Sequence, residues 1–307
     1  MDSAELKALT RRHRINTVLD IVGKSLISAG LLLLLFVAYQ LWGTGLAEHQ
    51  AQNKLQSQFA AATTVPASSA STIAPTTTTL APAPKTGDVI AEFIIDKIGV
   101  DKFVVAGVGY KELEKGPGLF TGSPLPGQLG NVAIAGHRTT YGAPFDKLNE
   151  LATGDRIVMK TSHATFTYIV SGAPKIVKAS DVDVIRTVDR TRAMLTLITC
   201  HPKWTSKNRL VVTAELLPTI TPQTATVFVE SEKAADAVLT EGWFHDPSAW
   251  PIVILLIALL AGIALFANRL ARQKWRAVIV YPIAAVVFLP TLFVFFAYLT
   301  RLLPTNL

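Results

Sequence analysis

The sequence predicts a mostly β-stranded domain, an antiparallel β-barrel with short helices, held by one N-terminal and two C-terminal transmembrane helices. Three observations lead to this prediction. Half of the 307 residues are hydrophobic, and the mean hydropathy of +0.38 is high for a soluble protein. Three apolar runs are long enough to cross a bilayer. Between them, short runs rich in β-branched and aromatic residues alternate with glycine and proline turns.

The first apolar run, 25–43, follows a basic tail, 1–24. The basic residues of this flank are Lys7, Arg11, Arg12, Arg14 and Lys24. Positive charge beside a span marks its cytoplasmic side, so the tail is predicted to be cytoplasmic. A cleaved signal peptide is the alternative, but the apolar run is unusually long and GTGLAEHQ is a poor cleavage site. We therefore expect a retained membrane anchor.

Two further spans, 250–267 and 277–299, precede a short tail, 300–307. The loop between them, 268–276, is basic and again predicted to be cytoplasmic. Its charged residues are Arg269, Arg272, Lys274 and Arg276. With the N-terminus inside, the first span exits, the second returns and the third exits. The segment 44–249 is then extracellular.

The formal charge of +7 raises the question of a nucleic-acid partner. Much of the basic excess, however, lies in the two cytoplasmic flanks, and the middle of the chain carries mixed charge without a basic stripe. The sequence shows no zinc-finger or helix-turn-helix pattern. We expect a membrane partner and no nucleic acid.

The extracellular part divides into a linker, 44–87, a globular domain, 88–218, and a connector, 219–249. Residues 60–85 are almost entirely Ala, Ser, Thr and Pro, a composition that cannot bury a core and predicts an extended spacer. The stretch before it is compatible with a short helix continuing from the first span. Within the connector, 224–246 is compatible with a short strand and a helix.

The domain 88–218 contains short β-rich runs separated by turns and no long amphipathic helix. One helical stretch is expected near APFDKLNEL, 143–151. The segment GPGLFTGSPLPG, 116–127, is interpreted as paired turns. The expected strands are IAEFIID, FVVAGV, NVAIAGH, DRIVMKT, TFTYIVSG, KIVK, MLTLITC and RLVVTAEL.

Cys200 is the only cysteine, so it is a small core residue, a free thiol or a nucleophile. It ends the run MLTLITC, in which Thr196, Ile198 and Cys200 share one face of a strand. Arg209 opens the next strand after a loop. If the two strands are neighbours, the thiol and the guanidinium lie at one rim of the sheet, and the positive charge favours the thiolate.

A thiol that attacks a carbonyl also needs a proton donor for the leaving group, usually histidine. His137 ends the strand NVAIAGH, and two strand-end residues of one small barrel can meet at a common rim. Each residue also has a structural interpretation. His137 can cap a strand, and Arg209 can be a surface ion-pair partner. No cluster of metal ligands stands out, so we expect no cofactor and no metal.

The segments NVAIAGHRTTYGAPF and TLITCHPKWTSKNRLVV resemble the signature segments of sortases, the membrane-anchored cysteine transpeptidases of Gram-positive bacteria. The resemblance covers roughly 88–218 and includes IDKIGVD and KGPGLFTGSPLPGQLGNVAIAGH. The family pattern is an upstream GH, a strand ending in TLxTC and a downstream arginine that opens the next strand. HRTTYGAPF and TCHP make the chain most similar to the class E enzymes of actinobacteria. Two C-terminal spans depart from the common sortase layout.

This resemblance implies a sortase-like barrel in which Cys200 is the nucleophile, His137 the general acid and base, and Arg209 the stabiliser of the substrate carbonyl and oxyanion. Tyr141 lies where class E enzymes are associated with preference for an LAxTG signal. Thr199 is a weaker candidate that shapes the pocket, with structural packing as its alternative role.

The resemblance also implies the partners and the location. The enzyme would cleave an LAxTG- or LPxTG-type sorting signal between Thr and Gly and join the surface protein to an amine of lipid II or a peptidoglycan stem peptide. The catalytic domain would lie outside the plasma membrane of a Gram-positive, actinobacterial cell. Two alternatives remain: a pilin-polymerising sortase, whose acidic–aromatic lid motif the linker lacks, and a non-catalytic membrane scaffold or wall-binding protein.

Overall fold

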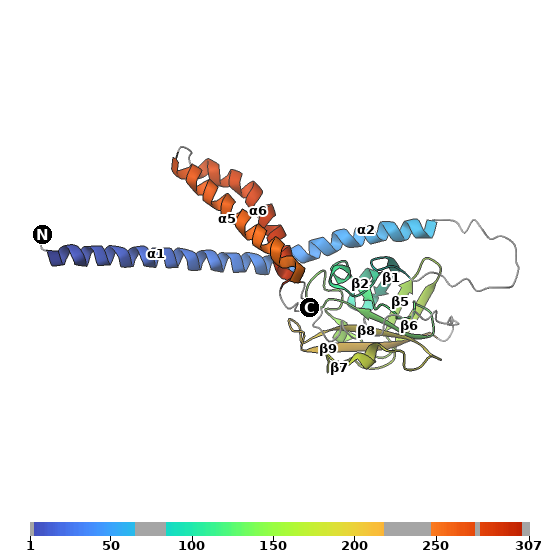
Figure 1. The fold of residues 1–307 in the computed structure, drawn as a ribbon. Helices are drawn as coiled ribbons and strands as arrows, with labels where there is room; N and C mark the ends of the chain where they lie inside the picture. Colours follow the sequence, from blue (N-terminus) through green and yellow to red (C-terminus); the bar gives the residue numbers. More distant parts are fainter. Residues whose placement is uncertain (1–2, 65–83, 218–246, 274–276, 303–307) are drawn as a thin grey trace. The chain divides into compact units, whose positions relative to one another are not determined.

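The computed structural model describes residues 3–64, 84–217, 247–273 and 277–302 (Figure 1). The chain forms two compact units, Met1–Gly43 and Thr44–Leu307. The strand and helix considered for 224–246 lie outside the described residues, as does most of the Ala/Ser/Thr/Pro-rich stretch.

Three of the described helices are long and apolar enough to cross a membrane, as the sequence predicts. In the first unit, α1 (Ser3–Ala38) continues into a π-helical turn, η1 (Tyr39–Gly43). In the second unit, α5 (Trp250–Gln273) and α6 (Ala277–Thr300) pack side by side as a hairpin (Figure 1). The helix α6 contains two prolines, Pro282 and Pro290, without an interruption. Most apolar side chains of these helices are exposed, which suits contact with lipid.

The globular part is a closed, mainly antiparallel β-barrel, which confirms the predicted fold. Its strand order is β6-β5-β1-β2-β3-β4-β8-β9, and β6 pairs with β9 to close the ring, while β7 adds to the free part of β9. Two neighbouring pairs, β2–β3 and β4–β8, are parallel. The strands are β1 (Val89–Ile95), β2 (Val100–Ala106), β3 (Gly118–Leu119), β4 (Gly130–Ala135), β5 (Arg156–Lys160), β6 (Thr165–Val170), β7 (Lys175–Lys178), β8 (Ala193–His201) and β9 (Asn208–Leu216).

Two expectations for the loops need correction. The helix expected over 143–151 is only a single 3-10 turn, η3 (Leu148–Glu150), because the main-chain bonds of this stretch span three residues, as from the Asp146 N–H to the Ala143 carbonyl and from the Leu151 N–H to the Leu148 carbonyl. The segment 116–127 contains turns, but it also contributes the two-residue strand β3. The remaining short helices are α3 (Tyr110–Leu113), η2 (Asp96–Ile98), η4 (Val182–Ile185) and η6 (Pro247–Ala249).

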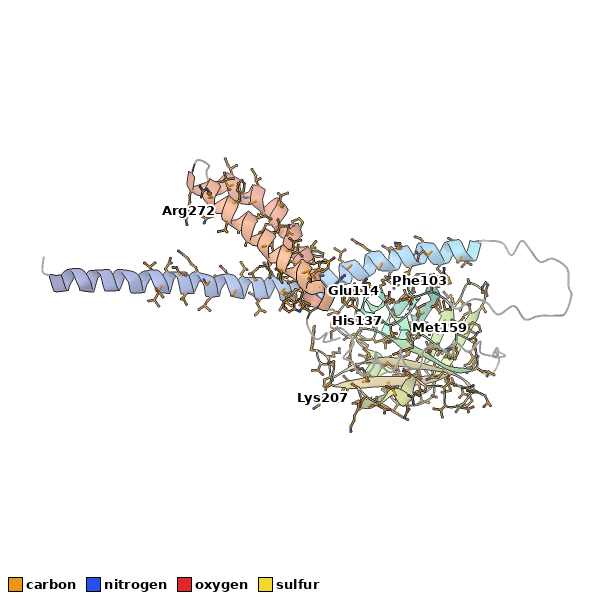
Figure 2. All side chains as sticks on the ribbon, viewed as in Figure 1. Phe103, Glu114, His137, Met159, Lys207 and Arg272 are labelled. Atoms are coloured by element: carbon orange, nitrogen blue, oxygen red, sulfur yellow. The ribbon has the colours of Figure 1, made fainter. Side chains whose placement is uncertain are left out.

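The alternation of side chains along the strands builds two separate apolar clusters. The barrel interior is filled by one cluster, which includes Phe93, Met159 and Leu197. Figure 2 labels Met159 and His137 among the densely packed side chains of the barrel. The second cluster lies on the opposite face of β4, β8 and β9 and includes Ile198 and Cys200. This outer cluster is covered by the segments around α3 and η4, so both faces of this wall are buried.

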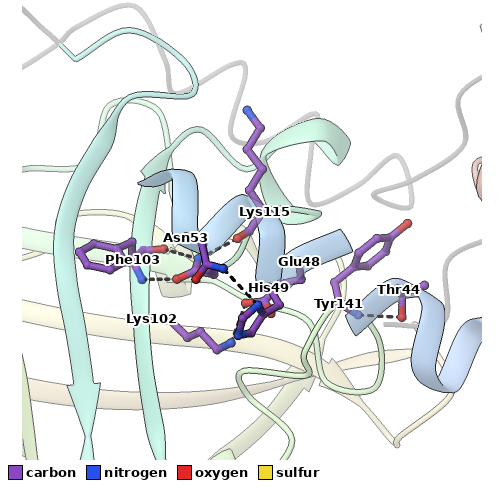
Figure 3. A network of polar contacts seen from close by, with 9 residues as sticks. Thr44, Glu48, His49, Asn53, Lys102, Phe103, Lys115 and Tyr141 are labelled. Atoms are coloured by element: carbon purple, nitrogen blue, oxygen red, sulfur yellow. Dashed lines mark hydrogen bonds and ion pairs between the residues drawn. The ribbon is translucent and has the colours of Figure 1, made fainter. Parts of the chain in front are cut away.

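The segment after the first unit forms an ordered helix, α2 (Thr44–Thr64), which packs against β1 and β2. Its buried stripe combines two polar residues, Glu48 and Gln52, with Leu55. The Gln52 amide donates to the carbonyls of Phe103 (3.0 Å) and Lys115 (2.7 Å), and its oxygen accepts from the Phe103 N–H at 2.7 Å. These bonds use both N–H groups of the amide and pair the main-chain N–H and carbonyl of Phe103 in β2. Figure 3 labels Phe103 and Lys115 among the polar contacts of this helix.

Candidate active site

Cys200 lies near the end of β8, on the outer face of the barrel wall. Leu197 belongs to the interior cluster, whereas Ile198 and Cys200 belong to the outer one. The prediction that Ile198 and Cys200 share a face is therefore confirmed. Cys200 is a free thiol with no exposed surface.

Arg209 lies directly opposite Cys200 in the antiparallel pair of β8 and β9. Directly paired residues of such a ladder place their side chains on the same face, so the guanidinium and the thiol are neighbours. The Nη1 of Arg209 donates to the carbonyl oxygens of Ser206 (2.8 Å) and Asn208 (3.2 Å) in the loop between the strands. The arginine is among the largest fully buried side chains of the described residues, which excludes the alternative of a surface ion pair.

His137 follows the end of β4, the strand on the other side of β8. The last paired residues of this parallel ladder are Ala135 and Ile198. Two positions further along each strand are His137 and Cys200. Adjacent strands lie about 4.8 Å apart, so this register brings the two residues to the same level of the wall. Three neighbouring strands thus align an imidazole, a thiol and a guanidinium, as the sequence predicts.

Thr199 fixes the main chain that carries His137. Its Oγ1 donates to the carbonyl of Gly136 at 2.8 Å, and the Gly136 N–H donates to the carbonyl of Ile198 at 3.1 Å. A side chain at Gly136 would lie 2.7 Å from the ring of Phe145, so only glycine fits between β8 and that ring. Thr199 therefore fixes the position of His137 through the backbone, and its side chain lies on the opposite side of β8 from the Cys200 thiol.

Burial sets the protonation states in this closed arrangement. It raises the pKa of the Cys200 thiol, although the charges of Arg209 and Arg138 partly oppose that rise. Burial also lowers the pKa of His137 to about 3. A neutral thiol therefore lies beside a neutral imidazole, and the thiolate expected from the nearby arginine alone is not favoured until water or substrate enters.

Tyr141 covers the histidine. The ring centroids of His137 and Tyr141 are 5.0 Å apart, and the tyrosine is only 4% exposed. Its backbone is left-handed at φ 48°, as is that of Ala143 at φ 43°. Residues with a Cβ adopt this conformation at a cost of about 1–2 kcal/mol each, so the loop is held in place by its contacts.

Arg138 is a site residue that sequence reasoning missed. Its Nη1 donates to the carbonyl oxygen of Cys200 (3.1 Å) and to His201 Nδ1 (2.9 Å), and its Nη2 donates to the Asn149 side chain at 3.0 Å. The arginine therefore ties the loop after β4 to the end of β8. The sequence indicates this residue only by its position directly after His137 in the segment GHR.

Within the described residues, no group of three or more His, Cys, Asp or Glu side chains is arranged to hold a metal ion. What the arrangement offers is covalent chemistry. A thiol can attack an electrophilic carbonyl, an imidazole can accept and return the proton, and a guanidinium can bind the oxygen on which negative charge develops.

The register of three neighbouring strands brings a thiol, an imidazole and a guanidinium to one level of the barrel wall, and comparison with known proteins identifies the family. Residues 93–217 match the sortase domain model. The chain is 34% identical over 214 residues to sortase SrtE1 of Streptomyces coelicolor, covering 64% of this chain and 56% of the relative. It is 34% identical over 119 residues to sortase D of Bacillus subtilis, covering 39% of this chain and 58% of the relative.

Among solved structures, sortase E of Streptomyces avermitilis is 37% identical, with 43% of this chain and 90% of that chain covered and a TM-score of 0.39. The sortase D5 transpeptidase of Clostridium perfringens is 32% identical, with 44% and 82% covered and a TM-score of 0.41. The chain belongs to the sortase family, and its relatives include class E sortases. It spans somewhat more than half the length of the two curated relatives described above.

Proposed function

We propose that this protein is a membrane-anchored cysteine transpeptidase that transfers a surface protein from its sorting signal to a cell-wall precursor. The observation that carries the proposal is the alignment of His137, Cys200 and Arg209 across β4, β8 and β9. A structural role alone does not account for three buried groups of complementary chemistry at one level of a barrel wall, because buried polar and charged groups cost stability.

In the first step, the Cys200 sulfur attacks the threonine carbonyl of the signal while His137 takes the thiol proton. Arg209 donates hydrogen bonds to the oxyanion that forms. The C–N bond to glycine then breaks, and His137 returns the proton to the leaving amine, so a thioester remains on Cys200. In the second step, an acceptor amine attacks the thioester, loses a proton to His137 and forms the new amide, and the thiol is regenerated.

The substrate proposed for this chemistry is an LAxTG- or LPxTG-type signal, with Tyr141 as a contact. The acceptor is an amine of lipid II or a peptidoglycan stem peptide. The catalytic domain would lie outside the plasma membrane of an actinobacterial cell. Basic residues in the N-terminal part of α1 and between the apolar runs of α5 and α6 support this orientation, because positive charge marks the cytoplasmic side.

The proposal is tested with the full chain in detergent, an LAxTG-containing peptide and hydroxylamine as the acceptor amine. We expect the threonyl hydroxamate by mass spectrometry from the unmodified chain and none from Cys200→Ala. Equal product from both proteins would exclude Cys200 as the nucleophile. Failure of the folded chain to cleave LAxTG, LPxTG and related peptides would favour the non-catalytic scaffold.

A further inference from the structure

The three groups proposed to do the chemistry are closed off from solvent in this structure. His137 and Arg209 are each 2% exposed, and Cys200 has no exposed surface. Tyr141 lies across the imidazole at 5.0 Å between ring centroids. Tyr141 is therefore one of the groups that cover the site, and the contacts that hold its ring in place bear on access to Cys200.

The first contact that holds Tyr141 comes from α2. The Tyr141 N–H donates to Thr44 Oγ1 at 3.2 Å, and Thr44 is 1% exposed. The same helix is fastened to the barrel one turn later, where the Glu48 carboxylate pairs with Lys102 at 2.7 Å. Glu48 also fills the space beside Gly142, since a side chain there would lie 2.5 Å from its Oε2. Figure 3 shows Thr44 beside Tyr141 and Glu48 near Lys102.

The second contact holds the other end of the tyrosine. The Tyr141 hydroxyl donates to Glu114 Oε1 at 2.8 Å, and the hydroxyl of Tyr110 donates to the same oxygen. The second carboxylate oxygen of Glu114 faces Arg301 Nη2 at 3.7 Å. The Arg301 guanidinium lies over the ring of Tyr110, with 4.9 Å to its centroid. Glu114 therefore joins Tyr141 to an arginine from the far end of the chain.

Both contacts originate beside membrane segments. Thr44 is the first residue after η1, which continues the apolar helix α1. Arg301 directly follows Thr300, the last residue of α6. The orientation predicted from the basic flanks puts both of these positions on the outer side of the membrane, the side proposed for the catalytic domain.

We propose that Thr44, Glu114 and Arg301 are positioning residues that hold Tyr141 over the active site, so that the outer ends of the membrane segments control access to Cys200. The inference rests on the proposed function in taking Cys200 as the reactive group. Release of the Tyr141 hydroxyl or of its N–H would let the left-handed loop relax and expose the thiol. The C-terminal hairpin, which the common sortase layout lacks, thereby gains a role.

The first test measures access to the thiol and requires no substrate. Because Cys200 is the only cysteine, its alkylation by iodoacetamide in the full, detergent-solubilised chain reports opening of the site alone. We expect alkylation to be about tenfold faster in Glu114→Gln and Arg301→Ala, since each loses a charge-assisted contact. Arg272→Ala is the matched control, because it removes an exposed arginine at the loop end of the same hairpin. Rates equal to those of the unmodified chain in both test variants would overturn the proposal.

Two pairs of more conservative variants, at Thr44 and at Tyr141, keep the test decisive if Arg301→Ala unfolds. Thr44→Val should accelerate alkylation whereas Thr44→Ser, which keeps the hydroxyl, should not. Tyr141→Phe removes only the oxygen that Glu114 binds, and adding Glu114→Gln to it should give no further acceleration. An additive effect of the two changes would show that Glu114 does not act through Tyr141.

Peptide transfer supplies the second readout. Opening the cover should lower KM for the signal peptide in Glu114→Gln and leave kcat within about twofold, whereas a general loss of structure would lower kcat. Absence of transfer by the unmodified chain would count against the proposed function, while the alkylation rates would still decide the positioning role.

Discussion

Both faces of β8 are buried, but their side chains differ in chemistry. Leu195 and Leu197 belong to the apolar cluster that fills the barrel interior. Cys200 lies on the outer face of the same strand, yet buried polar groups lie beside it: Arg209 on the neighbouring strand, and Arg138, which donates to the Cys200 carbonyl. The interior face stabilises the barrel, while the outer face carries buried charge at a cost in stability, which the proposed function explains by the positioning of reactive groups.

The largest expected effect comes from the outer face. Cys200→Ala should reduce peptide transfer by at least about 10³-fold, because no other thiol can form the acyl intermediate. Its melting temperature should stay close to that of the unmodified chain, since alanine fits the space of a small buried residue. Hydroxamate formation and circular dichroism measure the two quantities. A large fall in melting temperature together with retained transfer would reverse the roles assigned to the faces.

The opposite pattern is expected from the interior face. Leu197→Ala leaves a cavity among packed side chains and should lower the free energy of unfolding by about 3 kcal/mol. Well below the melting temperature, the transfer rate per folded molecule should be unchanged. Denaturant titration and initial rates test this, and a lost rate in a fully folded variant would show that the interior face also shapes the site.

Thr199→Val sharpens the comparison at the end of β8, where Thr199 alternates with Cys200 and lies on the same side of the strand as Leu197. The change leaves the buried Gly136 carbonyl without its donor, which should cost about 1–2 kcal/mol, and it should lower kcat about tenfold by displacing His137. Thr196→Val is the matched control on the same strand, because Thr196 Oγ1 donates to the Asn131 side chain at 2.7 Å, away from the histidine. Equal losses of kcat in the two variants would contradict a specific role of Thr199.

The most gradual effect is a pH dependence of stability. Burial holds the pKa of His137 at about 3, below its ordinary value of 6.5, so the folded chain binds fewer protons than the unfolded chain between these values. Stability should therefore fall as pH drops from 6.5 toward 3, by at most about 1.4 kcal/mol per pH unit from this residue. His137→Gln should lose this component. Unfolding curves of both proteins from pH 7 to 4 should diverge, and parallel curves would contradict a buried neutral imidazole.

Much of the barrel follows from local patterns in the sequence. Each predicted β-rich run forms a strand. A strand with one buried face alternates apolar and polar residues, and a strand with two buried faces is a continuous apolar run, so both are recognisable in the sequence. The pairing of Cys200 with Arg209 was also predictable, because a short loop joins the two strands and Arg209 opens the second one. The strand β3 was missed because two residues carry no period.

The contacts that close the site were not predictable from pattern. The buried stripe of α2 contains the polar residues Glu48 and Gln52, so the sequence of this helix shows no apolar periodicity that would predict its packing against the barrel. Arg301 and Glu114 are far apart in the sequence, and nothing in their local spacing indicates an ion pair. The sequence also suggested an activated thiolate from the nearby arginine, whereas full burial raises the pKa of Cys200, an effect that depends on the tertiary fold.

The central claim is that the outer face of β8 carries the nucleophile. It is tested most directly by acid-quenching the full chain during turnover with an LAxTG peptide and mapping the covalent adduct by mass spectrometry. The account predicts an acyl group, ending in the threonine of the signal, on the proteolytic fragment that contains Cys200, in the unmodified chain and in Leu197→Ala alike. An acyl group on any other residue, or transfer that continues in Cys200→Ala, would contradict it.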